Sequence, residues 1–74
     1  MCGIVGYTGA QEAAPLLLDG LKKLEYRGYD SAGIAVERAG VIRMIKASGQ
    51  IANLVEKTRG GDELPGHSGI GHTR

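Results

Sequence analysis

Apolar residues along the chain form one clear helical pattern and several short runs typical of strands. In the helical pattern an apolar side chain recurs every three or four positions, which predicts a helix over about residues 11–24. Its apolar positions are Ala14, Leu17, Leu18, Leu21 and Leu24. Pro15 fits this helix only in its first turn, where a missing N–H costs no hydrogen bond. Gly20 is expected to weaken the helix slightly and to allow close packing against a sheet.

Four further runs predict strands, at residues 2–7, 31–36, 41–46 and 68–74. The first two contain adjacent apolar or small residues rather than an alternation, so we expect each of them to be covered on both faces. A connection of hairpin length, residues 38–40, joins the second and third strands. The chain is therefore expected to be of the α+β class.

A second, shorter helix is predicted near residues 50–58, where Ile51, Leu54 and Val55 share one stripe. Ser48 is a suitable N-cap for it, since serine oxygens accept hydrogen bonds from the first free N–H groups of a helix. Residues 25–30 are too polar and too interrupted by glycine for a core element, so they are predicted to form a loop.

The small size of the chain limits the core that it can build. It has 74 residues, of which 42% are apolar, with three Tyr, no Phe and no Trp. A domain near 60 residues buries only about 60% of its unfolded surface, and a single Cys forms no internal disulfide. We therefore expect the chain to be part of a larger domain.

Composition and charge argue against several classes of function. Nine Lys and Arg against eight Asp and Glu give a net charge of +1 without a basic block, so a nucleic-acid partner is not expected. No apolar run is long enough to cross a membrane, and the N-terminus lacks the pattern of a secretory signal. His67 and His72 are five residues apart without a carboxylate cluster, so no metal site is expected. These features favour a cytoplasmic protein.

The single cysteine, Cys2, directly follows the initiator methionine. Removal of Met1 would leave Cys2 with a free α-amine of pKa about 7.7–8.0, partly neutral at physiological pH and able to act as a base. A thiol and a base on one residue form a self-contained nucleophile. The structural alternative is that Cys2 is a small apolar residue in a buried strand.

Three segments of the chain resemble the glutamine–fructose-6-phosphate aminotransferases (isomerizing), also called glucosamine-6-phosphate synthases. The segments are Met1-Cys2-Gly3-Ile4-Val5-Gly6, Leu24-Glu25-Tyr26-Arg27-Gly28-Tyr29-Asp30-Ser31-Ala32-Gly33-Ile34-Ala35 and Gly71-His72-Thr73-Arg74. The last segment looks like the start of the family's His-Thr-Arg-Trp-Ala-Thr-His-Gly motif. The resemblance extends over essentially the whole chain, with these segments in the family's order and at matching spacing.

The resemblance implies an N-terminal-nucleophile hydrolase fold, an αββα sandwich of which residues 1–74 supply the first strands and two helices. It implies a class II glutamine amidotransferase (glutaminase) domain that releases ammonia from L-glutamine. The ammonia passes to a sugar isomerase domain, absent from these residues, which converts fructose 6-phosphate to glucosamine 6-phosphate. It also implies a homo-oligomeric enzyme in its full-length form, with no cofactor.

Site residues are carried over from the family by position. Cys2 would be the nucleophile, and Arg74 would bind the α-carboxylate of glutamine, a group that a planar guanidinium pairs with bidentately. Arg27 would organise the surroundings of the nucleophile and lower its thiol pKa. For Arg74 the alternative is a solvated strand end. For Arg27 it is an arginine that orders its loop through backbone carbonyls.

The family's oxyanion-hole Asn-Gly pair does not occur in these residues. Because the loss of one oxyanion donor costs about 10²–10³ in rate, we expect the isolated chain to be inactive and poorly folded. Two alternatives stay open at this point. One is a different class II glutamine amidotransferase, disfavoured by the Tyr26–Asp30 loop. The other is a non-enzymatic small α/β module that binds a partner through its sheet edge.

Overall fold

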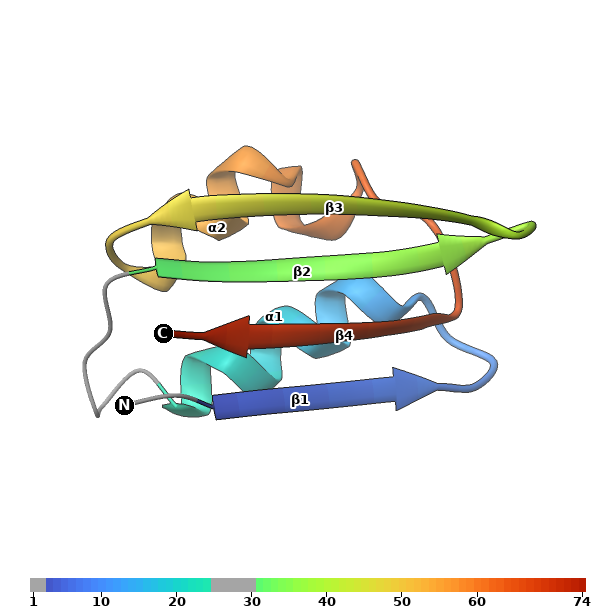
Figure 1. The fold of residues 1–74 in the computed structure, drawn as a ribbon, viewed down its shortest axis with the longest axis horizontal. Coiled ribbons are helices and arrows are strands. Elements are labelled where there is room, and N and C mark those ends of the chain that lie inside the picture. Colours follow the sequence, from blue (N-terminus) through green and yellow to red (C-terminus); the bar gives the residue numbers. More distant parts are fainter. Residues whose placement is uncertain (1–2, 25–30) are drawn as a thin grey trace.

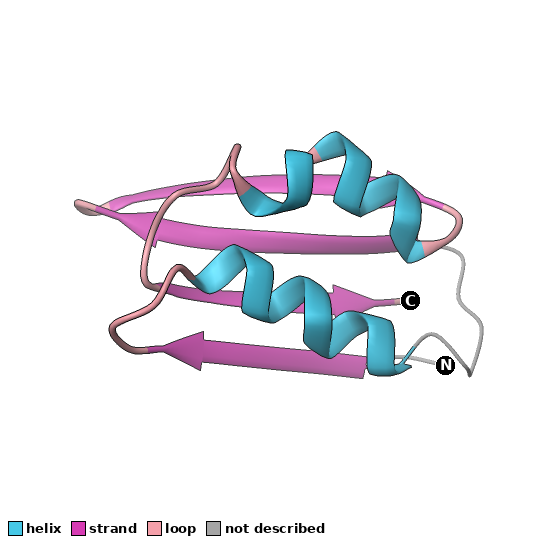
Figure 2. Cartoon of the chain, turned by 180° about the vertical axis from the view of Figure 1, so that it is seen from behind, coloured by secondary structure: helices cyan, strands magenta, loops and turns pink. Residues whose placement is uncertain are grey.

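The chain folds into one antiparallel sheet with two α-helices packed on the same face (Figures 1 and 2). The computed structural model describes residues 3–24 and 31–74. The elements are β1 (Gly3–Thr8), α1 (Ala13–Leu24), β2 (Ser31–Arg38), β3 (Val41–Ser48), α2 (Ile51–Lys57), a short 3₁₀ helix η2 (Arg59–Gly61) and β4 (Ser68–Thr73). The predicted α+β class is confirmed at this level.

The strand order is β1-β4-β2-β3, so the last strand lies between the first two (Figure 1). Every neighbouring pair is antiparallel, and β4 pairs with β1 through Ile4 and His72 and with β2 through Gly33 and His72. Helix α1 packs on β1 and β4, and α2 packs on β3 and β2. None of the described helices is long and apolar enough to span a membrane.

The hairpin between β2 and β3 closes with a two-residue turn, as the predicted short connection requires. Ala39 and Gly40 have φ values of 53° and 82°, so both central residues are left-handed. That conformation is typical of a type I′ turn, whose twist matches the twist of the flanking strands. The backbone N–H of Gly40 donates to Glu37 Oε2 over 2.9 Å, which holds the turn closed.

The core lies between the helices and the sheet. Its buried apolar residues are Ala13, Ala14, Leu17, Leu18, Leu21, Ala32, Ile34, Val36, Ile51, Leu54 and Leu64. Pro15 is the third residue of α1, which confirms its predicted place in the first turn. A Cβ added to Gly20 would lie 3.1 Å from Val5 Cγ1, so this glycine allows the predicted close approach of helix and sheet.

No described helix or strand covers the face of the sheet opposite the helices, so the prediction that the first strand is covered on both faces is wrong within the described residues, whereas residues 31–36 of the second strand are buried or half-buried on both faces. Ile4 of β1 is 78% exposed, and Met44 and Ile70 are 57% and 56% exposed. Both described α-helices pack on the other face (Figure 2), so they do not cover these side chains. We refer to this surface, formed by Ile4, Ala35, Ile42, Met44 and Ile70, as the open face.

The predicted N-cap of the second helix is also wrong. Ser48 is the last residue of β3, α2 begins at Ile51, and Gln50 occupies the N-cap position without a capping side-chain hydrogen bond. Strand β3 runs two residues further than its apolar run because the sheet pairing of β2 extends to Ser31, opposite Ser48. A tertiary pairing has therefore taken a residue that local propensity would assign to a cap.

Alanine at Gly69 is expected to destabilise the fold by about 1–3 kcal/mol, as overpacking does. The added Cβ would lie 2.5 Å from the backbone oxygen of Ala35 and 3.0 Å from Leu17 Cδ1, and the backbone oxygen has no freedom to move aside. Gly6 is the matched control, because a Cβ there meets nothing closer than 3.9 Å. Urea unfolding measures the free energy of unfolding of both variants. Equal losses at the two positions would contradict the packing described for β4.

Candidate functional site

The end of the sheet at which β1 begins and β4 finishes brings together three segments that are distant in sequence. Gly3 of β1 and Ala32 of β2 both lie opposite Thr73 of β4. The next residue, Arg74, continues this pairing. Its N–H donates to the Ser31 oxygen over 2.9 Å, and its own oxygen accepts from the Ser31 N–H over 3.4 Å. The backbone of Arg74 is thus fixed against β2, while the residue is exposed.

The start of β1 is held closely by two neighbours. A Cβ on Gly3 would lie 2.6 Å from Leu24 Cδ1 and 3.3 Å from Thr73 Oγ1. Glycine therefore lets the strand backbone lie directly against the last residue of α1, and Thr73, 4% exposed, fills the other side. Thr73 is not among the site residues predicted from the sequence, because the alternation along residues 68–74 places it on the face opposite the apolar Ile70, which the pattern would assign to the core.

On the open face at the same end, the side chains of Lys46 and His72 lie close to Gly33. A Cβ on Gly33 would come within 3.0 Å of Lys46 Cγ and 3.1 Å of His72 Nε2. Lys46 and His72 are the cross-strand neighbours of Gly33 in β3 and β4. With Arg74 two residues beyond His72, this end of the sheet is rich in groups that attract an anion such as a carboxylate.

Of the three site residues predicted from the sequence, the structure describes Arg74. Cys2, Arg27 and the rest of the predicted loop at residues 25–30 lie outside the described residues. Among residues 3–24 and 31–74, no three His, Cys, Asp or Glu side chains form a group suited to a metal ion.

The two histidines occupy different places in the fold. His67 precedes β4, and its Nδ1 lies 2.9 Å from the Gln11 carbonyl oxygen. Its Nε2 lies 3.7 Å from Glu12 Oε2, so His67 ties the β1–α1 connection to the start of β4. His72 lies near the other end of β4, beside Gly33. They therefore do not act together as ligands.

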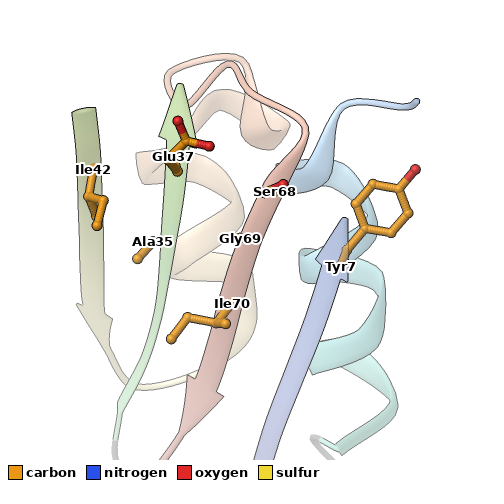
Figure 3. A pocket seen from close by; sticks show the side chains of 7 residues that line it. All are labelled: Tyr7, Ala35, Glu37, Ile42, Ser68, Gly69 and Ile70. Carbon is orange, nitrogen blue, oxygen red and sulfur yellow. The ribbon is translucent and has the colours of Figure 1, made fainter. Parts of the chain in front are cut away.

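A shallow apolar hollow of about 430 Å³ lies on the open face, toward the hairpin end of the sheet (Figure 3). Its lining residues are Tyr7, Ala35, Glu37, Ile42, Ser68, Gly69 and Ile70. The Glu37 carboxylate accepts from Gly40, and the Ser68 hydroxyl hydrogen-bonds the Thr8 hydroxyl over 2.7 Å. Because these polar groups are engaged in local bonds, the hollow offers apolar contact rather than chemistry.

No protein-family model matches the chain. Over all 74 residues it is 58% identical to the glutamine–fructose-6-phosphate aminotransferase (isomerizing) of Clostridium tetani. The corresponding proteins of Thermosynechococcus vestitus and Thermus thermophilus are 60% and 55% identical over the same 74 residues. The chain is homologous to the N-terminal part of these aminotransferases. It spans 12% of the length of each of them, and the alignment includes positions 2, 27 and 74.

Proposed function

We propose that residues 1–74 form the N-terminal part of a glutamine-hydrolysing domain in which Cys2, freed of Met1, is the nucleophile. The observation that carries this proposal is the identity of 55–60% with aminotransferases over an alignment of the whole chain, which includes position 2. The arrangement of the sheet supports it, since Cys2 is joined by a peptide bond to Gly3, which lies opposite the residue before Arg74.

In the proposed reaction, the neutral α-amine of Cys2 takes the thiol proton, and the thiolate attacks the side-chain carbonyl carbon of glutamine. A C–S bond forms, the C–N bond breaks, and the proton held by the amine leaves with ammonia. The product on the enzyme is a γ-glutamyl thioester. Water then attacks the same carbon and the C–S bond breaks, which releases glutamate, and a proton from the water restores the free thiol.

Arg74 is proposed to hold the α-carboxylate of glutamine. Its backbone is anchored by the two hydrogen bonds with Ser31, which limits the loss of entropy when the side chain engages a ligand. Its guanidinium carries five donors in a planar fork that matches a carboxylate, and Lys46 and His72 lie at the same end of the sheet. This region would select for the amino-acid end of the substrate, and the amide would be directed toward Cys2.

Arg74→Ala is expected to raise the KM for glutamine by about 10- to 100-fold, because a charge-assisted hydrogen bond contributes about 1.5–3 kcal/mol. Arg74→Lys should recover part of the loss, since an ammonium keeps the charge but not the bidentate geometry. The measurement is glutamate release at varied glutamine by the complete polypeptide that contains this chain. Arg43→Ala, an exposed position in the middle of β3, serves as the control. An unchanged KM in Arg74→Ala would exclude the carboxylate role.

The open face is proposed to pack against a second β-sheet supplied by the rest of the domain, giving the αββα sandwich of N-terminal-nucleophile hydrolases. Ile4, Met44 and Ile70 support this proposal, because each exposes more than half of a large apolar side chain. Burial of such side chains is favourable by about 25 cal/mol per Å² of apolar surface.

We propose that the ammonia is used to convert fructose 6-phosphate to glucosamine 6-phosphate in a separate part of the enzyme. The names of the relatives, which pair glutamine with fructose 6-phosphate, support this assignment. The test is to express the complete reading frame that contains these residues and to supply both substrates. Glutamate and glucosamine 6-phosphate in equal amounts are expected. Glutamate release without an aminated sugar would indicate another amidotransferase. The absence of both products would favour a non-enzymatic module.

A further inference from the structure

The two halves of the outer edge of β3 differ in how readily they could pair with a strand of another copy of the chain. Among the described strands, β3 pairs only with β2 and stands at the end of the sheet (Figure 1). Its first half, Val41–Ile45, is apolar except for Arg43 and contains no proline. Such an edge is a template for pairing with another strand.

The hairpin geometry determines which backbone groups of β3 face this edge. In a two-residue hairpin the residues that flank the turn, Arg38 and Val41, form a hydrogen-bonded pair. Hydrogen-bonded and non-hydrogen-bonded pairs then alternate along antiparallel strands. The residues whose N–H and C=O groups point outward are therefore Ile42, Met44, Lys46 and Ser48.

Two side chains of α2 occupy outward carbonyls in the second half of β3. Asn53 Nδ2 donates to the Ser48 oxygen over 2.9 Å, and Lys57 Nζ donates to the Lys46 oxygen over 2.7 Å. Asn53 and Lys57 are four residues apart, so they lie on one face of the helix. Both acceptors that an incoming strand would use beyond Met44 thus already accept a hydrogen bond from a side chain of α2, which competes with the backbone N–H of an incoming strand.

We propose that Asn53 and Lys57 form an edge lock, which prevents β3 from pairing with the β3 strand of a second copy of this chain. In an antiparallel pair of two copies, the residue at the centre of a register is the one that lies opposite the same residue of the second copy. A register centred on Met44 pairs Ile42 with Lys46 of the second copy and needs the Lys46 carbonyl that Lys57 holds. Registers centred further along also need this carbonyl or that of Ser48.

The remaining registers are disfavoured by other features of β3. A register centred on Arg43 places two guanidiniums directly opposite each other, which is destabilising. A register centred on Ile42 pairs Met44 with Gly40, which belongs to the turn and whose N–H is bound to Glu37 Oε2. Removal of the edge lock therefore opens the Met44-centred register, in which Ile42 and Met44 side chains of both copies pack together on the open face.

The test is sedimentation equilibrium of the complete polypeptide that contains this chain and of its Lys57→Met variant, which keeps the length of the side chain but removes its donors. The dissociation constant for association beyond the oligomer of the unsubstituted polypeptide is expected to fall at least about tenfold in the variant, the effect of roughly one net hydrogen bond. Lys57→Arg retains a donor and should behave like the original chain. Lys22→Met is the matched control, because it removes the same charge from the exposed last turn of α1.

A second substitution separates pairing at the edge from association through the open face. The Met44 N–H points outward, so Met44→Pro spares the hydrogen bonds to β2 and blocks pairing at the edge. In the Lys57→Met background it should abolish the added association, with circular dichroism confirming that the polypeptide is folded. The proposal is overturned if Lys57→Met and Lys22→Met have the same dissociation constant, or if Met44→Pro leaves the added association intact.

Discussion

Replacing Cys2 with alanine is expected to lower glutamine hydrolysis by the complete polypeptide at least about 10³-fold, as loss of the nucleophile does in enzymes with covalent intermediates. The alanine side chain forms no thioester, so the two-step route through a γ-glutamyl enzyme is closed. Glutamate release from glutamine is the measurement. Activity within tenfold of the unsubstituted protein would exclude Cys2 as the nucleophile.

The control for this variant is a direct supply of ammonia. If Cys2 serves to release ammonia for the sugar, ammonium salts should restore the formation of glucosamine 6-phosphate in Cys2→Ala while glutamine does not. Loss of both activities would instead indicate that the substitution disturbs the fold. Retention of Met1, detectable by mass spectrometry of the intact protein, should mimic Cys2→Ala because it converts the α-amine into an amide.

Replacing Leu21 with alanine is expected to cost about 3–5 kcal/mol of stability, in the upper part of the range for buried leucines. Leu21 is fully buried on the face of α1 that packs on β4. A Cβ on Gly71 would lie 3.2 Å from Leu21 Cδ1, so the leucine rests against strand backbone. Because Gly69 and Gly71 have no side chains to move into the space, the cavity should persist.

Urea unfolding followed by circular dichroism measures this loss. Leu16→Ala is the matched control, since Leu16 lies on the same helix and is only half-buried. Its cost should be less than half that of Leu21→Ala, because less apolar surface returns to water. A similar cost for the two leucines would indicate that α1 is not seated on β4 as described.

The local sequence pattern predicted correctly those elements that are determined by interactions between residues close in sequence. The repeat of Leu17, Leu18 and Leu21 corresponds to the buried face of α1, which begins at Ala13 rather than residue 11. The connection at residues 38–40 becomes a two-residue turn, although it has alanine at a left-handed position. Each of these features depends on contacts only a few residues apart.

Two predictions failed because distant parts of the chain decide them. Ser48 has the chemistry of a cap, but pairing with Ser31 draws it into β3. The adjacent Ile4 and Val5 suggested a strand covered on both faces, whereas the described helices cover the Val5 side alone. A run of apolar residues indicates the burial that a strand can accept, and the packed elements determine the burial that it receives.

The sequence by itself determined the succession of strands and helices, the compact turn, and the motifs shared with the aminotransferases, because these follow from side-chain type and short spacing. The candidate residues Cys2, Arg27 and Arg74 came from the same motifs. Only the tertiary structure decided that β4 lies between β1 and β2, which brings Arg74 beside Ser31 and to the end where Gly3 begins β1. It also decided that Asn53 and Lys57 reach the edge of β3. Strand order and edge contacts join residues far apart in sequence, and local propensity carries no information about which of the possible pairings buries the most apolar surface.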